Sequence, residues 1–292
     1  MTGGQNPAGP GIVDAHHHLW VRARHPQPWI DPSTMAAISR DFEVVDLAPL
    51  ARTAGVSGTV VVQSIASVAE TVELLGVAAD STLVRGVVGW VDLTAADVAD
   101  QLDRLRAARG GDRLVGIRHL VQAETDPAYL DRSDVRRGIA AVGAAGLVFD
   151  LLVREHQLAM ATRLAHDLPE VRFVLDHLGK PTLGGADPVD WARDLRALAA
   201  SPNTTAKLSG LVTEVRRTHW TPEDLRPAVA TALDAFGPDR LMFGSDWPVC
   251  LLASSYQRWV DALAETLGDL GAVERELVWA ETARRVYRSG AW

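Results

Sequence analysis

The chain has 292 residues, 47% of them hydrophobic, with 29 basic residues against 37 acidic ones and a formal net charge of -8. This length and apolar content are sufficient for one large domain with a substantial core. Because acidic residues are in excess and no basic run occurs, the chain lacks an electrostatic footprint for nucleic acid, which is not an expected partner.

The remaining composition favours a cytoplasmic protein. No apolar stretch is long enough to span a membrane, and the N-terminal residues lack the apolar segment of a secretory signal, so we expect no membrane association. Cys250 is the only cysteine, which excludes an intrachain disulfide. Residues 1–11 are rich in Gly and Pro, and we expect a flexible N-terminal segment there, followed by one domain over 12–292. Nothing in the pattern indicates an oligomeric state.

Eight short apolar runs rich in β-branched residues recur along the chain and predict strands. Two of them, 58–62 and 171–175, are almost continuously hydrophobic, which is typical of parallel strands in a sheet covered on both faces. The eight runs begin near Ile12, Thr59, Gly86, Leu114, Gly146, Val171, Thr204 and Leu241.

Segments with helical periodicity lie between these runs. In residues 95–109, for example, Val98, Leu102 and Leu105 mark one apolar stripe. Eight strand–helix units in succession predict an α/β protein with a (β/α)8 TIM barrel. An open doubly wound sheet is less favoured, because no glycine-rich phosphate loop follows any strand. The other predicted helices are 68–80, 133–145, 155–167, 189–200 and 222–236.

The interval from Leu19 to Asp41 is long and irregular. It contains Trp20, Trp29 and three prolines, so it is too rich in aromatic rings to be a simple spacer. We expect this loop to cover the mouth of the barrel.

Polar residues follow the predicted strands at their carboxyl ends, where barrel enzymes have their active sites. Side chains alternate along a strand, so His16 and His18 should face the same way and His17 the other. Any one of these residues can be structural, and for Asp92, His119, Asp150 and Ser209 a capping or core role is at least as good an explanation. The strand-end residues are His16, His18, Gln63, Ser64, Trp90, Asp92, Arg118, His119, Asp150, Asp176, His177, Lys207, Ser209, Ser245 and Asp246.

Five segments together resemble the amidohydrolase superfamily, in particular its amidohydrolase-2 group. They are DAHHHLW (14–20), GIRHLVQ (116–122), LVFDLLV (147–153), FVLDHLGKP (173–181) and MFGSDWP (242–248). Within that group they look like the sugar-lactonase branch, which contains enzymes similar to L-fuconolactonase and L-rhamnonolactonase and is related to 2-pyrone-4,6-dicarboxylate lactonase. The resemblance covers about residues 12 to 287.

The resemblance implies one site made of His16, His18, His177 and Asp246, with two alternatives for its positive charge. These four residues form a ligand set that a single Zn²⁺ accepts readily, and Glu124 is a further, weaker ligand candidate. A second metal is disfavoured, because the fourth strand ends in Arg118 and the fifth offers no histidine. Some members of the branch work without a metal, and Arg118 would then supply the charge.

The resemblance further implies hydrolysis of a sugar-acid lactone, a 1,5- or 1,4-aldonolactone, to the aldonate. Asp246 is the expected general base for water. The three histidines, with Arg118 or a metal, would polarise the carbonyl, and Lys207 is expected to lie farther away. Two alternatives stay open, a zinc-dependent decarboxylase of the same superfamily and a non-catalytic sugar-binding barrel. The predicted sugar contacts are Gln63, Trp20, Trp29, Lys180, His119 and Trp247.

Overall fold

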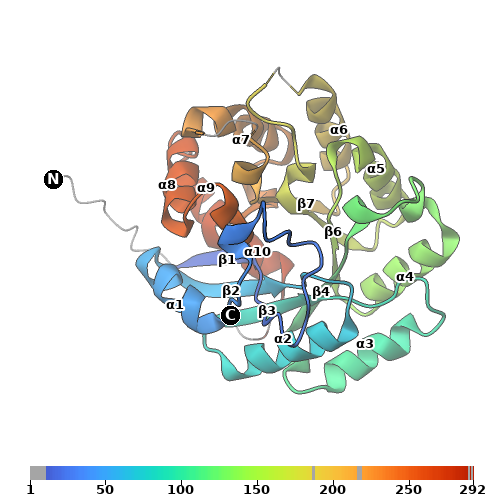
Figure 1. The fold of residues 1–292 in the computed structure, drawn as a ribbon. Coiled ribbons are helices and arrows are strands. Elements are labelled where there is room, and N and C mark those ends of the chain that lie inside the picture. Colours follow the sequence, from blue (N-terminus) through green and yellow to red (C-terminus); the bar gives the residue numbers. More distant parts are fainter. Residues whose placement is uncertain (1–10, 186–187, 216–218, 289, 291) are drawn as a thin grey trace.

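Eight parallel strands follow one another in chain order around a barrel, with helices between them, in the computed structural model (Figure 1). The structure describes residues 11–185, 188–215, 219–288, 290 and 292, so residues 1–10 of the predicted N-terminal segment lie outside the described part. The predicted (β/α)8 barrel is confirmed. The strands are β1 (Ile12–His17), β2 (Val56–Val62), β3 (Val84–Gly89), β4 (Leu114–His119), β5 (Val148–Leu151), β6 (Arg172–Leu175), β7 (Thr204–Leu208) and β8 (Leu241–Phe243).

The helices surround the strands, and six of them match the predicted segments to within about a turn. Two longer helices, α1 and α8, were not predicted. Pro49 lies inside α1, where it lacks the N–H that an interior helical residue donates. No helix among the described residues is long and apolar enough to cross a membrane. The helices are α1 (Val44–Thr53), α2 (Val68–Asp80), α3 (Val98–Ala107), α4 (Ser133–Ala144), α5 (Leu158–Asp167), α6 (Val189–Ala199), α7 (Pro222–Phe236), α8 (Tyr256–Thr266), α9 (Ala272–Glu276) and α10 (Thr282–Val286).

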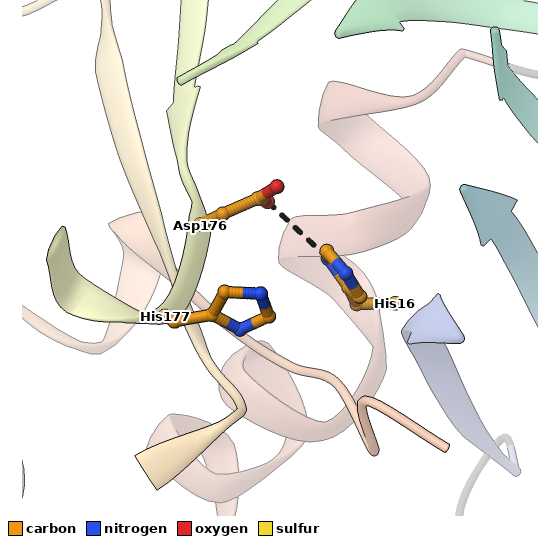
Figure 2. Close-up of side chains that lie close together, drawn as sticks. All are labelled: His16, Asp176 and His177. Atoms are coloured by element: carbon orange, nitrogen blue, oxygen red, sulfur yellow. Dashed lines mark ion pairs between the residues drawn. The ribbon is translucent and has the colours of Figure 1, made fainter. Parts of the chain in front are cut away.

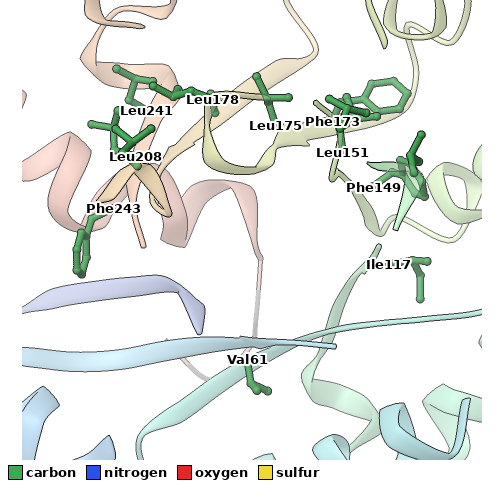
Figure 3. Close-up of a cluster of buried hydrophobic side chains, with 14 of the residues drawn as sticks. Val61, Ile117, Phe149, Leu151, Phe173, Leu175, Leu178, Leu208, Leu241 and Phe243 are labelled. Atoms are coloured by element: carbon green, nitrogen blue, oxygen red, sulfur yellow. The ribbon is translucent and has the colours of Figure 1, made fainter. Parts of the chain in front are cut away.

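Alternation along the strands divides the core into two apolar layers. The outer layer lies between strands and helices, as Figure 3 shows for side chains such as Phe149, Phe173 and Leu208. The inner layer fills the barrel with the alternate residues, mostly valines, and is joined from the C-terminal end by Tyr287. Inward positions nearer the carboxyl ends of the strands are polar, and these residues lie beneath the candidate site described below.

The barrel is completed between β1 and the segment that follows the short strand β8. Backbone bonds cross this seam from Asp246 N to His16 O (2.7 Å) and from His18 N to Trp247 O (2.7 Å). The carboxylate of Asp14 adds two more, accepting from Ser245 N (2.8 Å) and from Tyr256 OH (3.0 Å). The seam therefore fixes the two ends of the chain against each other where the polar residues gather.

A β-bulge in β1 changes the phase of side-chain alternation. Asp14 is paired with Thr59 and His17 with Val61, so three steps on β1 correspond to two on β2. Val13 and Ala15 belong to the inner layer, and strict alternation from them would turn His16 outward. The extra residue restores an inward direction to His16, which is the kind of re-aiming that bulges provide near active sites.

We predict that Asp14 is the main side-chain stabiliser of this seam. In Asp14→Ala, the N–H groups of His16 and Ser245 and the hydroxyl of Tyr256 lose their buried acceptor, each at a cost of about 1–3 kcal/mol. The free energy of unfolding in urea should fall by more than about 3 kcal/mol. Tyr256→Phe, the matched control, removes one of the three bonds and should cost about 1 kcal/mol. Equal losses in the two variants would contradict this assignment.

Candidate active site

Three imidazoles converge on one carboxylate oxygen at the carboxyl ends of β1, β6 and β8. Asp246 Oδ1 lies 3.4 Å from His18 Nε2, 3.7 Å from His16 Nε2 and 3.9 Å from His177 Nε2. All four residues are buried, with at most 5% of each exposed. The structure thus brings together the four residues that the sequence singled out.

Left-handed backbone positions aim two of these side chains. His177 and Asp246 each have a φ of 54°, a conformation that costs energy in residues other than glycine and is held only by surrounding contacts. Gly210 supplies the space beside them, since a Cβ there would lie 2.5 Å from His177 Nδ1. Strained positions of this kind are common at active sites.

Hydrogen bonds on the far side of two rings hold their orientation. His18 Nδ1 lies 2.8 Å from the carbonyl oxygen of Val62, which can only accept, so this nitrogen carries a proton. His177 Nδ1 lies 2.8 Å from Ser209 Oγ, and because a hydroxyl can donate or accept, this bond fixes the orientation of the ring but not its tautomer.

Burial and neighbouring groups shift the pKa values of two rings and of the carboxylate at the centre. Burial lowers the pKa of His177 to about 4 and that of His16 well below its usual value. Burial alone would raise the pKa of Asp246, but His177, the hydrogen bond from His18 and the charge of His16 hold it below its usual range. Asp246 is therefore a carboxylate at neutral pH, as a general base must be.

A layer of buried charges lies under His16. Asp176 Oδ1 is 3.2 Å from His16 Nδ1 (Figure 2), and its other oxygen accepts from Arg118 Nη1 at 3.0 Å. Lys207 Nζ lies 2.6 Å from Asp150 Oδ2, 2.9 Å from Asp176 Oδ1 and 3.1 Å from His16 Nδ1. The expectation that Lys207 is the more distant cation is wrong, because Arg118 approaches His16 only to 3.4 Å. Inward alternation from Val148 and Val174 places Asp150 and Asp176 in this layer, a signal that the sequence analysis did not use.

His17 points away from the centre. Its Nε2 lies 2.9 Å from Thr59 Oγ1, and burial lowers the pKa of the ring to about 3. The alternation expected for residues 16 to 18 is therefore present in the structure.

The predicted sugar contacts fall into two classes. Trp20 stacks on His18 with ring centroids 6.4 Å apart, and Trp29, which is 36% exposed, packs edge-on against Trp20. The loop between β1 and α1 thereby reaches the site, and its dark-blue trace lies in front of the strands in Figure 1. Gln63 and Trp247 are fully enclosed instead, Gln63 by its bond to the Arg118 carbonyl (3.1 Å) and Trp247 by Phe42.

Two further predicted contacts, Lys180 and His119, lie beside acidic partners. Lys180 is partly exposed and lies 3.8 Å from Glu214. His119 Nδ1 accepts from Trp90 Nε1 at 3.1 Å, so its Nε2 carries the proton that bonds Glu124 Oε1 at 2.6 Å. Glu124 is thus engaged by His119.

The residues present fit a single metal ion of the zinc type. Tetrahedral ligands about 2.0–2.1 Å from zinc lie roughly 3.3–3.4 Å apart. His16 Nε2 and His18 Nε2 are 3.3 Å apart, and His18 Nε2 is 3.4 Å from Asp246 Oδ1. Among the described residues, two groups are close enough to hold a metal, one of His16, His18 and Asp246 and one of His16, Asp176 and His177, and neither includes Glu124. The first group fits better, because Asp176 is already paired with two cations.

Comparison with known proteins places this barrel and its site in a family. The amidohydrolase family model matches residues 13–289. L-Fucono-1,5-lactonase of Burkholderia multivorans is 42% identical over 94% of this chain and 95% of its own length, and the enzyme of the same name from Burkholderia ambifaria is 39% identical over the same shares. A crystal structure of an amidohydrolase from Burkholderia multivorans with bound zinc has a TM-score of 0.89 and 39% identity, covering 96% of this chain and all of that one.

The chain therefore belongs to the amidohydrolase family, and the predicted resemblance to its sugar-lactonase branch is confirmed. It is an enzyme of the hydrolase class. More distant structures, such as 2,6-dihydroxybenzoate decarboxylase at 15% identity and a TM-score of 0.66, show the shared fold alone.

We predict that the three consecutive histidines differ in their effect on turnover. His16→Asn and His18→Asn each remove a ring from the centre and should lower kcat by about 10²-fold or more, the typical cost of one stabilising donor. His17→Asn should lower the free energy of unfolding while leaving kcat per folded molecule nearly unchanged, because its ring contacts Thr59. Turnover and urea unfolding should be measured on all three variants. Equal losses of kcat at the three positions would refute the prediction.

Proposed function

We propose that this protein hydrolyses a sugar-acid lactone, a 1,5- or 1,4-aldonolactone, to the aldonate. The observation that carries the proposal is the convergence of three imidazole Nε2 atoms on the Asp246 carboxylate in a buried barrel site. Two relatives at 42% and 39% identity are named L-fucono-1,5-lactonase, which favours a lactone of a six-carbon sugar acid as substrate.

Asp246 is the proposed general base. Its ionised carboxylate takes a proton from water as the water oxygen attacks the lactone carbonyl, and returns that proton to the ring oxygen when the C–O bond breaks. This cycle consumes one water and needs no covalent intermediate. Positioned proton transfer of this kind is worth about 10²–10⁴ in rate.

The carbonyl oxygen needs positive charge or N–H donors as it becomes an oxyanion. His16, His18 and His177 surround the position that such an oxygen would take, and Arg118 Nη1 lies 3.4 Å from His16 Nε2. A Zn²⁺ held by the three histidines and Asp246 would supply Lewis-acid polarisation instead. Trp29 and Lys180, at the exposed edge of the site, are the proposed contacts for the sugar hydroxyls.

The two alternatives, a zinc-dependent decarboxylase and a non-catalytic sugar-binding barrel, make different demands on the site. A decarboxylase acts on acids and would lose all activity on removal of its metal, whereas a sugar-binding barrel would bind a lactone without consuming it. A decarboxylase can use the same set of three histidines and an aspartate, so the substrate distinguishes it from a lactonase, and neither alternative involves attack of an activated water on a carbonyl. The family relatives above 30% identity with an assigned name point to the lactone.

A panel of sugar lactones assayed with a pH indicator tests the function. We expect acid release from at least one 1,5- or 1,4-aldonolactone, with L-fucono-1,5-lactone among the first to try. The same panel after chelation and metal analysis separates the two sources of polarisation: zinc dependence predicts complete loss, and a metal-free site predicts retained turnover. Carboxylic-acid substrates serve as the control, and their turnover in place of lactones would overturn the proposal.

Replacement of the base tests the mechanism. Asp246→Asn has nearly the same shape but cannot accept the proton of water, so kcat should fall by about 10²–10⁴-fold. Circular dichroism and thermal unfolding should confirm that the variant folds. Retention of more than roughly a tenth of wild-type turnover on the best lactone would show that another group acts as the base.

A further inference from the structure

A lysine and a glutamate face each other at the exposed edge of the site. Lys180 follows β6 and Glu214 follows β7, and Lys180 Nζ lies 3.8 Å from Glu214 Oε1. Their side chains are 19% and 20% exposed. The distance is longer than the roughly 2.7–3.2 Å of an N–H···O hydrogen bond. The pair is therefore an electrostatic contact, and both groups can still form hydrogen bonds with a third molecule.

Backbone bonds between three loops hold these two side chains opposite each other. Lys180 has a left-handed φ of 55°. Two residues farther on, Thr182 N donates to Glu155 Oε2 at 3.1 Å, and Leu183 N donates to the carbonyl oxygen of Glu214 at 3.2 Å. The loops after β5, β6 and β7 are thereby joined. None of these bonds uses the side chain of Lys180 or Glu214, so substitution of either side chain leaves them in place.

The charge of Asp246 acts on both side chains. Burial lowers the pKa of Lys180, and the charges of Glu214 and Asp246 offset part of this shift. Burial also raises the pKa of Glu214, where Lys180 and Arg154 oppose the shift and Asp246 adds to it. Lys180 and Glu214 therefore lie within electrostatic range of the proposed base.

A bound lactone has to extend toward this edge. The other side of the centre is filled by the buried charges under His16, so a lactone with its carbonyl at Asp246 directs its substituents toward the exposed edge. A hydroxyl group both donates and accepts, so it can satisfy Lys180 and Glu214 together. A carboxylate only accepts, so it can bond Lys180 but meets Glu214 as a like charge.

We propose that Glu214 is a specificity-determining residue, which acts with Lys180 to select lactones that carry a hydroxyl group at this edge and to reject lactones that carry a carboxylate there. The inference rests on the proposed lactonase function and names the class of substrate within it, neutral aldonolactones as opposed to acidic aldarolactones. Glu214 serves as an attractive contact for the hydroxyl and as a repulsive one for the acid, and specific sites commonly combine the two.

Two 1,4-lactones of the same configuration test this selection. An aldonolactone and the corresponding aldarolactone differ only in whether the terminal carbon is a CH₂OH group or a carboxylate. The measured quantity is the ratio of kcat/KM for the neutral lactone to kcat/KM for the acidic one. Wild type should favour the neutral lactone by about 10-fold or more, because like charges in contact at a partly buried site are costly.

Substitutions of the pair should move this ratio in opposite directions. Glu214→Gln keeps the shape and the hydrogen-bonding capacity but removes the repulsion, so the ratio should fall by about 10-fold. Lys180→Met leaves Glu214 without its cation, so the ratio should rise by a similar factor. Arg154 is present in all variants and its effect cancels in the comparison. Thermal unfolding checks that each variant folds.

Glu170→Gln is the matched control. Glu170 is exposed and lies just before β6, at the opposite end of the barrel, so its substitution removes the same charge far from the site. The ratio should stay at the wild-type value. This control separates a local effect of Glu214 from an effect of the net charge of the protein.

Three results would overturn the inference: equal kcat/KM for the two lactones in wild type, an unchanged ratio in Glu214→Gln, or shifts in the same direction in Glu214→Gln and Lys180→Met. Lactone turnover with any of these results refutes the specificity alone. Absence of all lactone turnover refutes the proposed function instead, and the ratio of the affinities for the two lactones, measured by calorimetry on the same variants, then decides the role of Glu214.

Discussion

The seam between β1 and the segment after β8 is the constraint on which the site depends. His16 and His18 come from the first strand and Asp246 from just beyond the last, so their spacing is set by how the two ends of the barrel meet. Strand β8 has three residues, and the seam is made beyond it by backbone bonds and by the carboxylate of Asp14. Gly244 permits the close approach, since a Cβ there would lie 2.7 Å from the Cβ of His16. The contacts that close the barrel therefore also set the positions of these site residues.

The charged layer beneath the site is a second consequence of barrel geometry. Parallel strands point alternate residues inward, and in this chain the inward positions change from valine to Arg118, Asp150, Asp176 and Lys207 toward the carboxyl ends. Buried charges are tolerated only when paired and hydrogen-bonded. Two cations face two carboxylates here, and Tyr287 donates to Asp150 at 2.8 Å from the apolar end of the barrel. The two cations and two carboxylates balance, so the layer places polar groups in the core without a net charge. It contacts the centre through His16.

Much of this architecture is predictable from local pattern, and what is not depends on contacts between distant segments. The eight strands and six helices follow from β-branched runs and helical stripes. The four convergent residues follow from polar residues at strand ends together with the family resemblance. The bulge in β1 leaves no sequence signal, because it is a mismatch in register between two strands. The position of Lys207 was misjudged because its reach across the barrel interior depends on three other strands. Trp247 and Gln63 are enclosed for the same reason: exposure is decided by neighbours such as Phe42 and Arg118 rather than by the residue itself.

The proposed hydrolysis requires stabilisation of the developing oxyanion with or without a metal, because the negative charge on that oxygen needs a cation or an N–H donor directed at it. A metal ion and an N–H group both provide this stabilisation, but they place opposite demands on Nε2 of His16, a lone pair in one case and a proton in the other. Asp246, the proposed base, and the rings of His18 and His177 would keep their positions around the carbonyl oxygen in either arrangement.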